Sequence, residues 1–525
     1  MNNFITKEID KDILEKNIDK VIVRFPPEPN GYLHLGHAKS IIINSEIARK
    51  YNGILNLRFD DTNPDKENIE YVNAIKEDAF WLADNFNNIT WTSNYFDNIY
   101  DCAILLIKKG LAYVDDHSIE EIKEMRGNFY NKGIKSEYRN RTVEENLKLF
   151  NEMKNGKFKE EEKVLRAKID MDHENMNMRD PVIYRIRKTK HHNTGDKWCI
   201  YPLYDFAHPI SDGIEGITHS LCTLEFENHR ILYDWFIENC KELLKSIPKE
   251  LEFSELNVEG ILLSKRKLNN LIEERKVENW SDPVLPTISG LRKRGFTPEL
   301  LRNIVDRIGV TKVESITNYE LIEEVIRDTL ANSERTMSII NPIELEIENY
   351  NNYFDKECKI NIPLNPRNKD LGDRVVNLSS KIYVEETDIS LNPDKNFWRI
   401  YEGNTIRLKN GYNIIIKKII SKDNKPIKVI GEIDYESKNM KKAKVKAKVA
   451  LHWLSDIDAE KINLIKYKAL INKDKEINNN FKNVKEILIH KDLKDKKGFF
   501  EFERSGYYFN DGFNIHLLAK IKNFK

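Results

Sequence analysis

The spacing of apolar residues in the first hundred positions predicts alternating strands and helices. The apolar run at 21–23 is typical of a buried strand, and apolar residues then recur at helical spacing as far as Ala48. A second strand is expected at 54–59 and a second helix at about 67–83. This alternation predicts a parallel sheet covered by helices.

The pattern changes several times farther along the chain. A charged, mixed stretch predicts an inserted domain, after which strand-like and helical segments resume. Repeated helical spacing follows, and then short alternating β-branched runs with hairpin signals at NGY and DNKP, which predict antiparallel sheets. The boundaries that we expect are 20–100 with 198–260 for an α/β catalytic domain in two halves, 101–197 for an α+β insertion, 261–335 for a helical domain, and 336–525 for a β-rich region.

Composition narrows the class of protein. The chain has 525 residues, of which 40% are hydrophobic, and it has no apolar run near the eighteen residues that cross a membrane. The charged start is unlike a targeting peptide and predicts the cytoplasm. Five cysteines without a CxxC pair argue against a disulfide framework and a zinc site, and no metal site is expected. The absence of GxGxxG argues against a dinucleotide oxidoreductase.

Charge is unevenly distributed although the net charge is zero. Residues 341–525 carry 36 Lys and Arg against 27 Asp and Glu, whereas residues 1–340 carry 49 against 58. A basic C-terminal region is compatible with a polyanionic partner. A lysine-rich solvated surface is the commoner meaning of such a count, so both interpretations stay open.

The stretch RFPPEPNGYLHLGHAKS, at 24–40, places His34 and His37 at the start of the first helix. Helix N-termini expose unpaired N–H groups and a partial positive charge, which suit a phosphate or another developing anion. Residues three apart lie on the same side of a helix turn, and Gly36 would let a flat ligand lie against the backbone. The tetrapeptide alone is equally compatible with a helix that happens to carry two histidines.

Further segments argue against a helix that carries two histidines by chance. Together with 24–40, LRFDDTNP (57–64), THSLCTLEF (218–226) and LLSKRKL (262–268) resemble the successive motifs of class I aminoacyl-tRNA synthetases of the glutamyl/glutaminyl subfamily. The resemblance covers nearly the whole chain and is strongest for the glutamine-specific members. It implies a Rossmann-like, HIGH-type catalytic domain, an α+β insertion that grips the acceptor end of tRNA, a helical domain, and C-terminal antiparallel β-barrels that bind the anticodon.

The resemblance also implies an activity. The protein would ligate L-glutamine to its cognate tRNA in two steps, ATP-dependent formation of glutaminyl adenylate and transfer to the 2′-hydroxyl of the terminal adenosine. Its small-molecule partners would be glutamine, ATP and Mg²⁺. It would need no membrane and would act as a monomer.

Adenylate formation builds negative charge on the phosphates, so the protein must supply positioned donors and cations. The resemblance gives the catalytic roles to His34, His37, Ser264 and Lys265; Leu263 replaces the usual Met of that second motif. Glu255 stands where relatives tend to have Arg. The ATP-binding residues implied are Glu28, Pro29, Asn30, His34, Leu35, Gly36, His37, Ala38, Lys39, Ser40, Thr223, Leu256, Leu263, Ser264 and Lys265.

Glutamine and glutamate are nearly the same size, so their discrimination must come from polar groups. An acid needs cationic partners, whereas an amide needs acceptors for its N–H groups. The resemblance assigns the glutamine pocket to Asp60, Tyr204, Arg24 and Cys222. Glutamyl enzymes tend to have Arg where this chain has the neutral Cys222, and relatives usually have Gln at Glu250; both differences disfavour glutamate.

Residues 395–409 interleave aromatics with cations, the combination that binds unpaired bases and phosphates. The resemblance places tRNA-binding residues at Lys312, Arg335, Arg399, Arg407 and Lys409. A strand with core aromatics and solvated charges is the alternative for each of them. In the insertion, the residues basic enough to contact tRNA are Arg139, Arg141, Arg166 and Lys168, each of which is more often a surface charge.

Two alternatives to a glutamine-specific enzyme stay open. A glutamyl-tRNA synthetase is the nearest, and a catalytically silent relative that only binds tRNA is the second. The complete set of HLGH, LLSK, Asp60 and Tyr204 favours an active enzyme over the silent relative. A nucleotidylyltransferase on another acceptor would share HxGH but would not need LRFDDTNP, a long insertion and a basic β-rich tail.

Overall fold

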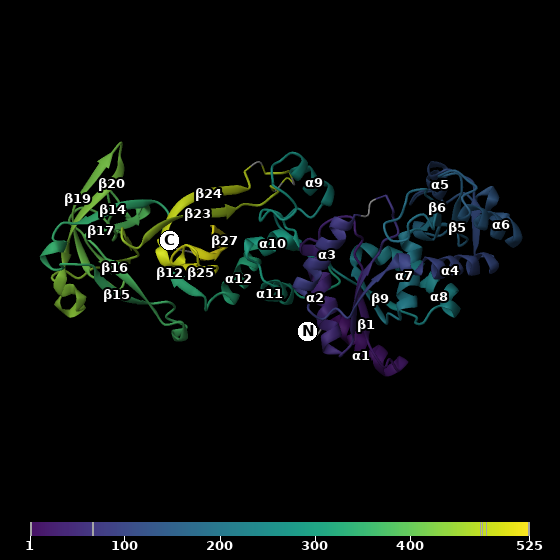
Figure 1. Ribbon diagram of the computed structural model, residues 1–525, viewed down its shortest axis with the longest axis horizontal. Helices are drawn as coiled ribbons and strands as arrows, with labels where there is room; N and C mark the ends of the chain where they lie inside the picture. Colours follow the sequence, from purple (N-terminus) through teal and green to yellow (C-terminus); the bar gives the residue numbers. More distant parts are fainter. Residues whose placement is uncertain (1–2, 66–67, 473, 475, 479, 523–525) are drawn as a thin grey trace.

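The computed structural model describes residues 3–65, 68–472, 474, 476–478 and 480–522. The molecule is elongated, with the α/β part at one end and the β-rich part at the other (Figure 1). The helical segment between 265 and 329 joins the two ends (Figure 1). None of the helices in these ranges has the length and apolar character that a membrane span requires.

A parallel sheet with the order β1-β2-β3 forms the first half of the catalytic domain. The strand expected at 54–59 is β2, and the helix expected at about 67–83 is α3, so both predictions are confirmed. The helix expected after the first strand is α2, which begins within HLGH. The elements are β1 (Ile22–Phe25), α2 (Leu35–Lys50), β2 (Ile54–Phe59), α3 (Ile69–Leu82) and β3 (Asn88–Trp91).

The second half adds the parallel pair β8 (His219–Thr223) and β9 (Lys249–Phe253). This pair lies beside β1, because the backbone N–H of Thr218 donates to the carbonyl of Ile22 at 2.9 Å. The accompanying helices are α7 (Tyr204–Glu215) and α8 (Arg230–Cys240). An N-terminal helix, α1 (Phe4–Lys16), buries Ile5 and Ile9 against the same sheet.

The insertion is an antiparallel sheet with the order β4-β5-β6-β7, covered by helices. The apolar residues of α4 and of the sheet share one core with α7 and α8, so the insertion is packed firmly against the second half of the catalytic domain. The elements are α4 (Phe96–Lys108), β4 (Ala112–Asp115), α5 (Ile119–Arg126), α6 (Val143–Lys154), β5 (Val164–Ala167), β6 (Val182–Ile186) and β7 (Ile200–Pro202).

Short helices follow the LLSK segment. Thr287 and Thr297 cap two of them with side-chain oxygens, and Gly295 and Gly309 follow their ends, as expected from the capping preferences of these residues. The elements are β10 (Asn257–Val258), α9 (Lys265–Glu273), α10 (Ile288–Arg294), α11 (Pro298–Ile308), β11 (Ile316–Thr317) and α12 (Tyr319–Thr329).

The β-rich region consists of two seven-stranded, barrel-like sheets and a separate hairpin. The sheet next to the helices has the order β12-β25-β26-β27-β23-β24-β13, and the distal sheet has the order β21-β18-β19-β20-β14-β17-β22. Most pairs are antiparallel, while β12 with β25, β14 with β20, β18 with β21 and β23 with β27 are parallel. The strands are β12 (Glu334–Thr336), β13 (Ser338–Ile339), β14 (Pro342–Ile347), β15 (Cys358–Pro363), β16 (Asp373–Leu378), β17 (Lys381–Glu385), β18 (Thr405–Leu408), β19 (Asn413–Lys422), β20 (Lys425–Asp434), β21 (Ala450–Leu451), β22 (Leu454–Ser455), β23 (Ala459–Tyr467), β24 (Lys482–His490), β25 (Gly498–Phe502), β26 (Gly506–Asn510) and β27 (Asn514–Lys520).

Both expected hairpin turns are present in the distal sheet. Asn410 lies at φ 57° between β18 and β19. Asp423 and Asn424 lie at φ 49° and 60° between β19 and β20, the left-handed pair of a tight hairpin turn. Asn and Asp tolerate this region better than other residues with side chains, which explains why the turns fall there.

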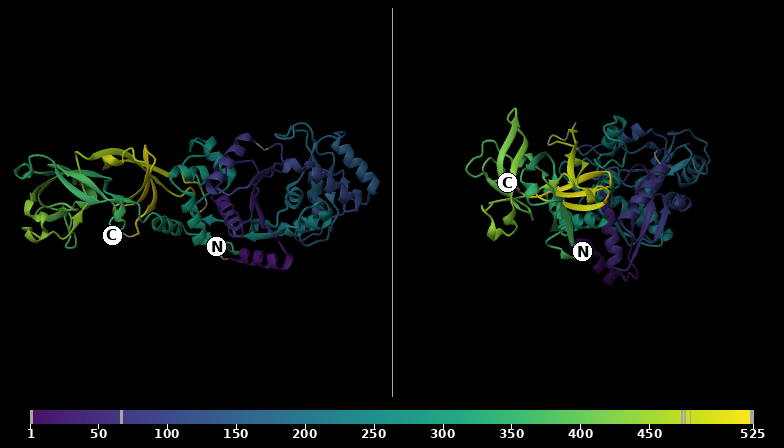
Figure 2. Two further views of the ribbon diagram at one scale, coloured as in Figure 1. Left: turned by 60° about the horizontal axis from the view of Figure 1, so that its bottom comes forward. Right: turned by 60° about the vertical axis from the view of Figure 1, so that its left-hand side comes forward.

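The chain returns from the distal sheet to pack on the helices, as both views in Figure 2 show for the yellow C-terminal strands. Arg327 of α12 donates to the carbonyl of Lys520 at 2.8 Å. The connection between β23 and β24 reaches the segment before LLSK, where the backbone N–H of Leu470 donates to the carbonyl of Gly260 at 3.1 Å. The β-rich and catalytic parts are therefore in direct contact.

Candidate active site

The two histidines of HLGH cap the N-terminus of α2. His34 is the N-cap residue, and its Nδ1 accepts the backbone N–H of Gly36 at 3.1 Å. The Nδ1 of His37 accepts the backbone N–H of His34 at 3.1 Å. Their ring centroids lie 3.9 Å apart. An imidazole that accepts at Nδ1 carries its proton at Nε2, so both rings have an Nε2–H donor left for a ligand.

Both imidazoles are held neutral. Burial, with a contribution from the Lys265 cation, lowers the pKa of His34 to about 4. Burial and the neighbouring His34 and Lys265 lower the pKa of His37 well below its usual value. Near neutral pH the pair therefore presents neutral N–H donors beside one cation, an arrangement that suits the oxygens of a polyphosphate.

The turn that carries the histidines is fixed from the other side by the segment before α10. The backbone N–H of Leu35 donates to the carbonyl of Pro286, and that of Ile288 donates to the carbonyl of Leu33, both at 2.9 Å. A Cβ added at Gly36 would lie 3.0 Å from Cε1 of His34, which explains why a residue without a side chain stands there. The PTIS segment is thus part of the scaffold of the site.

The structure brings LLSK to HLGH. Lys265, the first residue of α9, donates from Nζ to Oδ1 of Asn30 at 2.5 Å. Burial lowers the pKa of Lys265, and the carboxylate of Glu28 opposes this shift. Ser264 is exposed at the N-cap of α9, where its hydroxyl makes no capping bond. The two motifs, more than 200 positions apart, therefore form the walls of one site.

The other positions expected to bind ATP differ in what they offer. Lys39 is buried, and its Nζ donates to the carbonyl of Ser254 at 2.6 Å, so its ammonium points into the protein. Leu256 is also buried. The hydroxyl of Thr223 donates to Glu225 at 3.0 Å. In this arrangement Thr223 offers a polar side chain at the site, whereas Lys39 and Leu256 are buried and form part of its walls.

The departure at Glu255 places several carboxylates together near this site. Burial raises the pKa of Glu255, and Glu225 and Glu314 add to the shift, while Lys39 opposes it. A raised pKa favours the neutral form, which reduces the repulsion that a carboxylate would exert on a triphosphate. The Glu255 side chain is half-buried rather than directed into solvent.

Asp60 stands at the carboxyl end of β2 in the expected amino-acid pocket. One of its oxygens accepts from Nε of Arg58 at 2.7 Å and from the hydroxyl of Thr92 at 2.8 Å. The other lies 2.9 Å from Nδ1 of His208. Burial alone would raise the pKa of Asp60, but Arg58 and His208 outweigh it and lower the value to about 2. The residue is therefore an anion, as binding an α-ammonium group requires.

Tyr204 lies near both Asp60 and Cys222, because both residues affect its pKa. The ring of Tyr204 stacks on His208 with centroids 4.9 Å apart. Burial raises the pKa of Tyr204 well above its usual value, and the nearby charge of Asp60 adds to this shift. Burial and the neighbouring Glu250 likewise raise the pKa of the Cys222 thiol. The hydroxyl and the thiol are both neutral hydrogen-bonding groups near neutral pH.

A buried ion network lies beneath the pocket. Of its members, only Arg24 and Asp60 were predicted from the sequence. Asp212 is its centre and accepts from both Arg24 and Arg58, at 3.0 and 2.6 Å. His208 lies between the two guanidinium groups, 2.7 Å from Arg24 and 3.1 Å from Arg58. Charged residues inside the apolar stretches of β2 and α7 were the signal that could have revealed them.

Arg24 lies near Tyr204, as expected, and its direct contact with glutamine stays a prediction. Its guanidinium is fully buried and donates to Asp212, to the hydroxyl of Ser220 at 2.5 Å and to the carbonyl of Leu221 at 3.0 Å. These bonds occupy each of its nitrogen atoms. Arg24 therefore supports the pocket from below.

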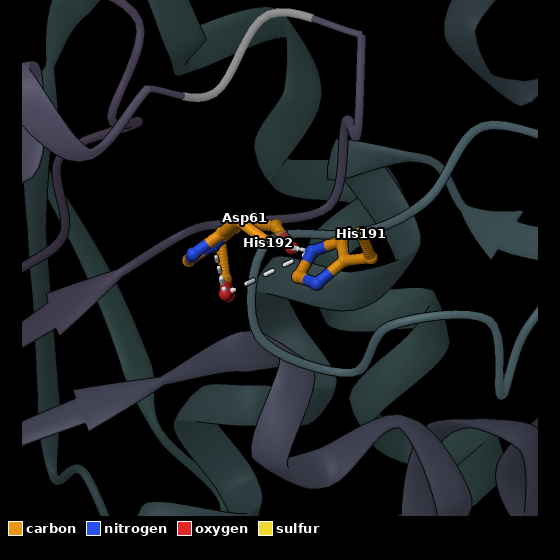
Figure 3. A group of neighbouring side chains, drawn as sticks. All are labelled: Asp61, His191 and His192. Carbon is orange, nitrogen blue, oxygen red and sulfur yellow. Dashed lines mark hydrogen bonds and ion pairs between the residues drawn. The ribbon is translucent and has the colours of Figure 1, made fainter.

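Asp61, His191 and His192 form a second cluster next to Asp60 (Figure 3). Such a group could hold a metal ion, but hydrogen bonds account for its geometry. Nδ1 of His191 accepts the backbone N–H groups of Asn193 and Thr194, which leaves an Nε2–H for the carbonyl of Asp61 at 2.9 Å. His192 lies 3.0 Å from the Asp61 carboxylate, which also accepts from Ser93. The cluster ties the loop at 188–197 to the end of β2.

Three of the five residues expected to bind the anticodon gather near the turn between β25 and β26. Arg335 pairs with Glu501 at 2.9 Å, and Lys409 pairs with Glu503. Arg399 lies 3.4 Å from Asp388, which also binds Arg504 through two bonds of 2.8 Å. Trp398 is exposed beside Arg399, and Lys448 stands over its ring. This cluster lies where the two β-sheets meet.

The remaining two positions lie elsewhere. Arg407 of β18 donates to Asn413 and to the carbonyl of Ser437, at 3.1 and 3.0 Å. Lys312 stands over the ring of Phe4 in α1, on the catalytic part of the molecule. Lys312 is thus separate from the cluster near the β25–β26 turn.

The basic residues of the insertion are engaged in ion pairs. Arg139 binds Asp180, Arg141 binds Asp116, and the fully buried Arg166 binds Asp115 at 2.8 Å. Arg166 is buried and is therefore not a surface charge, whereas Arg139 and Arg141 are partly exposed and their contact with tRNA stays a prediction. The loop after α5 instead exposes two aromatics, Phe129 at 84% and Tyr130 at 96%. Exposed aromatic rings are the usual platforms for unpaired bases.

Comparisons with known proteins give two family matches and several similar proteins. Residues 20–332 match the family described as tRNA synthetases class I (E and Q), catalytic domain, and residues 333–436 match the anti-codon binding domain of the same class. A glutamine-tRNA ligase of Clostridium kluyveri is 47% identical over 97% of this chain and 94% of its own length. That of Neisseria gonorrhoeae is 48% identical over 89% of this chain and 84% of its own. A solved glutamate-tRNA ligase of Elizabethkingia meningosepticum has a TM-score of 0.44 and 20% identity, covering 60% of this chain and 70% of that one.

Proposed function

The chain belongs to the class I tRNA synthetases for glutamate and glutamine, and from this premise we propose that it is a glutamine-tRNA ligase. In the first step the α-carboxylate of glutamine attacks the α-phosphorus of ATP, and pyrophosphate leaves. In the second step the 2′-hydroxyl of the terminal adenosine of tRNA attacks the carbonyl carbon of the adenylate, and AMP leaves. ATP would enter as its magnesium complex, as substrate.

The contact between Lys265 and the HLGH side of the site carries the proposal of catalysis. Lys265, beside Asn30, and the Nε2–H groups of His34 and His37 are positioned before any ligand arrives. Donors fixed in advance stabilise charge that develops on phosphate oxygens without a reorganisation cost. A silent relative would have no need for two neutral imidazoles and a half-buried lysine on one site.

The amino-acid pocket supports glutamine. The α-ammonium group would bind Asp60, and the side-chain amide would reach the hydroxyl of Tyr204. A second carboxylate on the substrate would need a cation, but Arg24 is already bound to Asp212. Cys222 offers a neutral thiol at the same wall. Glutamate would therefore lose its hydration at the pocket without gaining a counterion.

The β-rich region would bind the anticodon and the insertion would bind the acceptor end. Arg335, Arg399 and Lys409 support the first assignment, because partly exposed cations beside Trp398 suit phosphates and unpaired bases. Phe129 and Tyr130 support the second. A monomer in the cytoplasm completes the proposal; all five cysteines, each in the described part of the chain, are unpaired, as in a reducing compartment.

Charging of glutamine-accepting tRNA with labelled glutamine and, in parallel, with labelled glutamate tests this function. We expect ATP-dependent charging with glutamine and little with glutamate. Efficient charging with glutamate alone would make the protein a glutamyl-tRNA synthetase. Tight tRNA binding without either product would instead identify a silent relative.

A further inference from the structure

Glu250 is a buried acid at the wall of the amino-acid pocket. It is the second residue of β9 and is paired in register with Ser220 of β8, so its side chain is on the same face of the sheet as Cys222. It is 6% exposed, and it lines one small cavity with Tyr204 and His208. Its Oε2 is buried and has no hydrogen-bond partner among the described residues. A buried polar atom without a partner is costly unless a ligand satisfies it.

Most of the cations near Glu250 are paired with another carboxylate. Arg24 binds Asp212, Arg230 binds Glu252 at 2.9 Å, and His229 binds Asp205 at 2.8 Å. Lys249, the preceding residue, binds Glu8 and Asp12, and Lys312 stands across an outer groove, over the ring of Phe4. The titratable and charged groups around Glu250 are Glu8 on α1, Arg24 on β1, Tyr204, Asp205, His208 and Asp212 on α7, Cys222 on β8, His229 before α8, Arg230, Tyr233 and Asp234 on α8, Lys249 and Glu252 on β9, and Lys312 after α11.

We propose that Glu250 contacts the side-chain amide of bound glutamine and that its protonation state sets how strongly the pocket rejects glutamate. This inference rests on the proposed function as a glutamine-tRNA ligase. It deepens that function by adding a specificity-determining residue whose effect changes with pH.

The two forms of the carboxyl group treat the two substrates differently. The neutral form has one donor and one acceptor, like the amide of the Gln that relatives usually have there, and its O–H can donate to the second carboxylate of glutamate. The ionised form is acceptor-only: it receives an amide N–H from glutamine and repels a carboxylate. Burial raises the pKa of Glu250 to about 8, with Arg24 opposing the shift, so both forms occur near neutral pH.

The sign of the pH effect follows. As pH rises toward and past about 8, Glu250 becomes ionised. Rejection of glutamate should therefore increase with pH. For a group with this pKa the neutral fraction falls about fourfold between about pH 6.5 and 8.5. Because glutamate binds the neutral form, its inhibition constant, divided by the Michaelis constant of glutamine, should rise by at least about that factor.

Glutamine charging, with unlabelled glutamate as competitor, tests this at saturating ATP and tRNA. Wild type should show the rising ratio, whereas Glu250→Gln, nearly the same in size, should give a ratio that does not change with pH. Glu227→Gln removes an exposed carboxylate of the same region and should behave like wild type. A flat ratio in wild type, or the same slope in Glu250→Gln, would overturn the proposal. Absence of glutamine charging at every pH would refute the proposed function instead.

Stability gives a second measurement that needs no activity. A carboxyl group whose pKa is higher in the folded state stabilises the fold fully below its unfolded value of 4.5, and this contribution is lost as pH rises through about 8. The Glu250→Gln variant has no carboxyl group at this position, so its stability does not fall in this way as pH rises. Its melting temperature, measured relative to wild type, should therefore increase steadily between about pH 5 and 8.5. A difference that is constant over this range would show that Glu250 does not titrate there and would contradict the proposal.

Discussion

Arg24 of β1 and Asp212 of α7, 188 positions apart, are joined by two hydrogen bonds of 3.0 Å, and both side chains are fully buried. The same carboxylate accepts from Arg58 and from the hydroxyl of Tyr233. Burial alone would raise the pKa of Asp212, but the two arginines lower it far below its usual range. One anion thus neutralises two cations directly beneath the amino-acid pocket, so the shape of the pocket depends on Asp212.

Asp212→Asn should destabilise the fold. The substitution leaves two buried guanidinium groups with less compensation, and breaking a buried ion pair from one side typically costs about 3–5 kcal/mol. Urea unfolding followed by circular dichroism measures the loss. Asp234→Asn, an exposed position on α8, is the matched control and should change stability little. Equal stability of Asp212→Asn and wild type would show that Arg24 and Arg58 need no buried anion.

Asp60 should make stability depend on pH in the acid range. Its pKa is about 2 in the folded protein and 3.8 in the unfolded chain, so its stabilising contribution is complete above about pH 4 and is lost as pH falls toward 2. The stability difference between wild type and Asp60→Asn should therefore shrink below about pH 4. Thermal unfolding of both proteins over this range checks the sign. A difference that grows on acidification would contradict the assignment of Asp60 as the anion.

Lys265→Ala should mainly lower turnover. The lysine is placed against Asn30 and the two imidazoles, and loss of one positioned donor typically reduces the rate on the order of 100-fold. Charging kinetics at saturating ATP separate this effect from weaker binding. Lys267→Ala removes an exposed cation two positions away on α9 and should retain wild-type turnover. Near wild-type turnover of Lys265→Ala would sink the catalytic assignment.

Cys222→Arg should weaken glutamine and admit some glutamate. A guanidinium at this wall would pair with the neighbouring Glu250, which takes that acceptor away from the glutamine amide, and it would offer further N–H donors to a second carboxylate on the substrate. Competition between labelled glutamine and glutamate measures the preference. Cys222→Ser keeps a small neutral group and should preserve the preference of wild type. If Cys222→Arg left that preference unchanged, residue 222 would not line the pocket.

Local patterns gave much of the fold. The strand at 54–59, the helix that starts in HLGH and the hairpin turns at Asn410 and Asp423 follow from residue spacing and turn chemistry, which act over a few neighbours. Pairings between distant strands, such as β14 with β20, leave no comparable local trace. The contact of Leu470 with Gly260 likewise depends on how the β-rich region folds back.

The candidate site shows the same limit. The sequence motifs identified five residues that the structure places in adjacent parts of one site: His34, His37, Lys265, Asp60 and Tyr204. Spacing could not show that Arg24 and Lys39 are turned into the protein, because each of them bonds with a residue about 190 to 215 positions away. The carboxylate partners of the insertion arginines could not be predicted from spacing either, because they too lie far beyond the neighbouring residues in the sequence. A charged residue within an apolar strand or helix, such as Arg58 or Asp212, is the local signal that such a network exists.

Arg399→Ala should impair recognition of the anticodon without affecting the chemistry. Arg399 stands beside the exposed Trp398, held near Asp388, in the cluster where the two β-sheets meet. Loss of one cation that contacts phosphate or a base typically costs about 1–3 kcal/mol. We therefore expect kcat/KM for intact tRNA to fall, while an acceptor-stem minihelix, which has no anticodon, is charged as by wild type.

Two comparisons make this last result decisive. Lys425→Ala removes an exposed cation at the tip of the β19–β20 hairpin, away from the Arg399 cluster, and should leave both substrates unaffected. Raising the salt concentration should weaken wild type more than Arg399→Ala on intact tRNA if the lost contact is to a phosphate. An equal loss of Arg399→Ala on tRNA and minihelix would place the residue in general folding or catalysis, because the minihelix cannot reach the β-rich region.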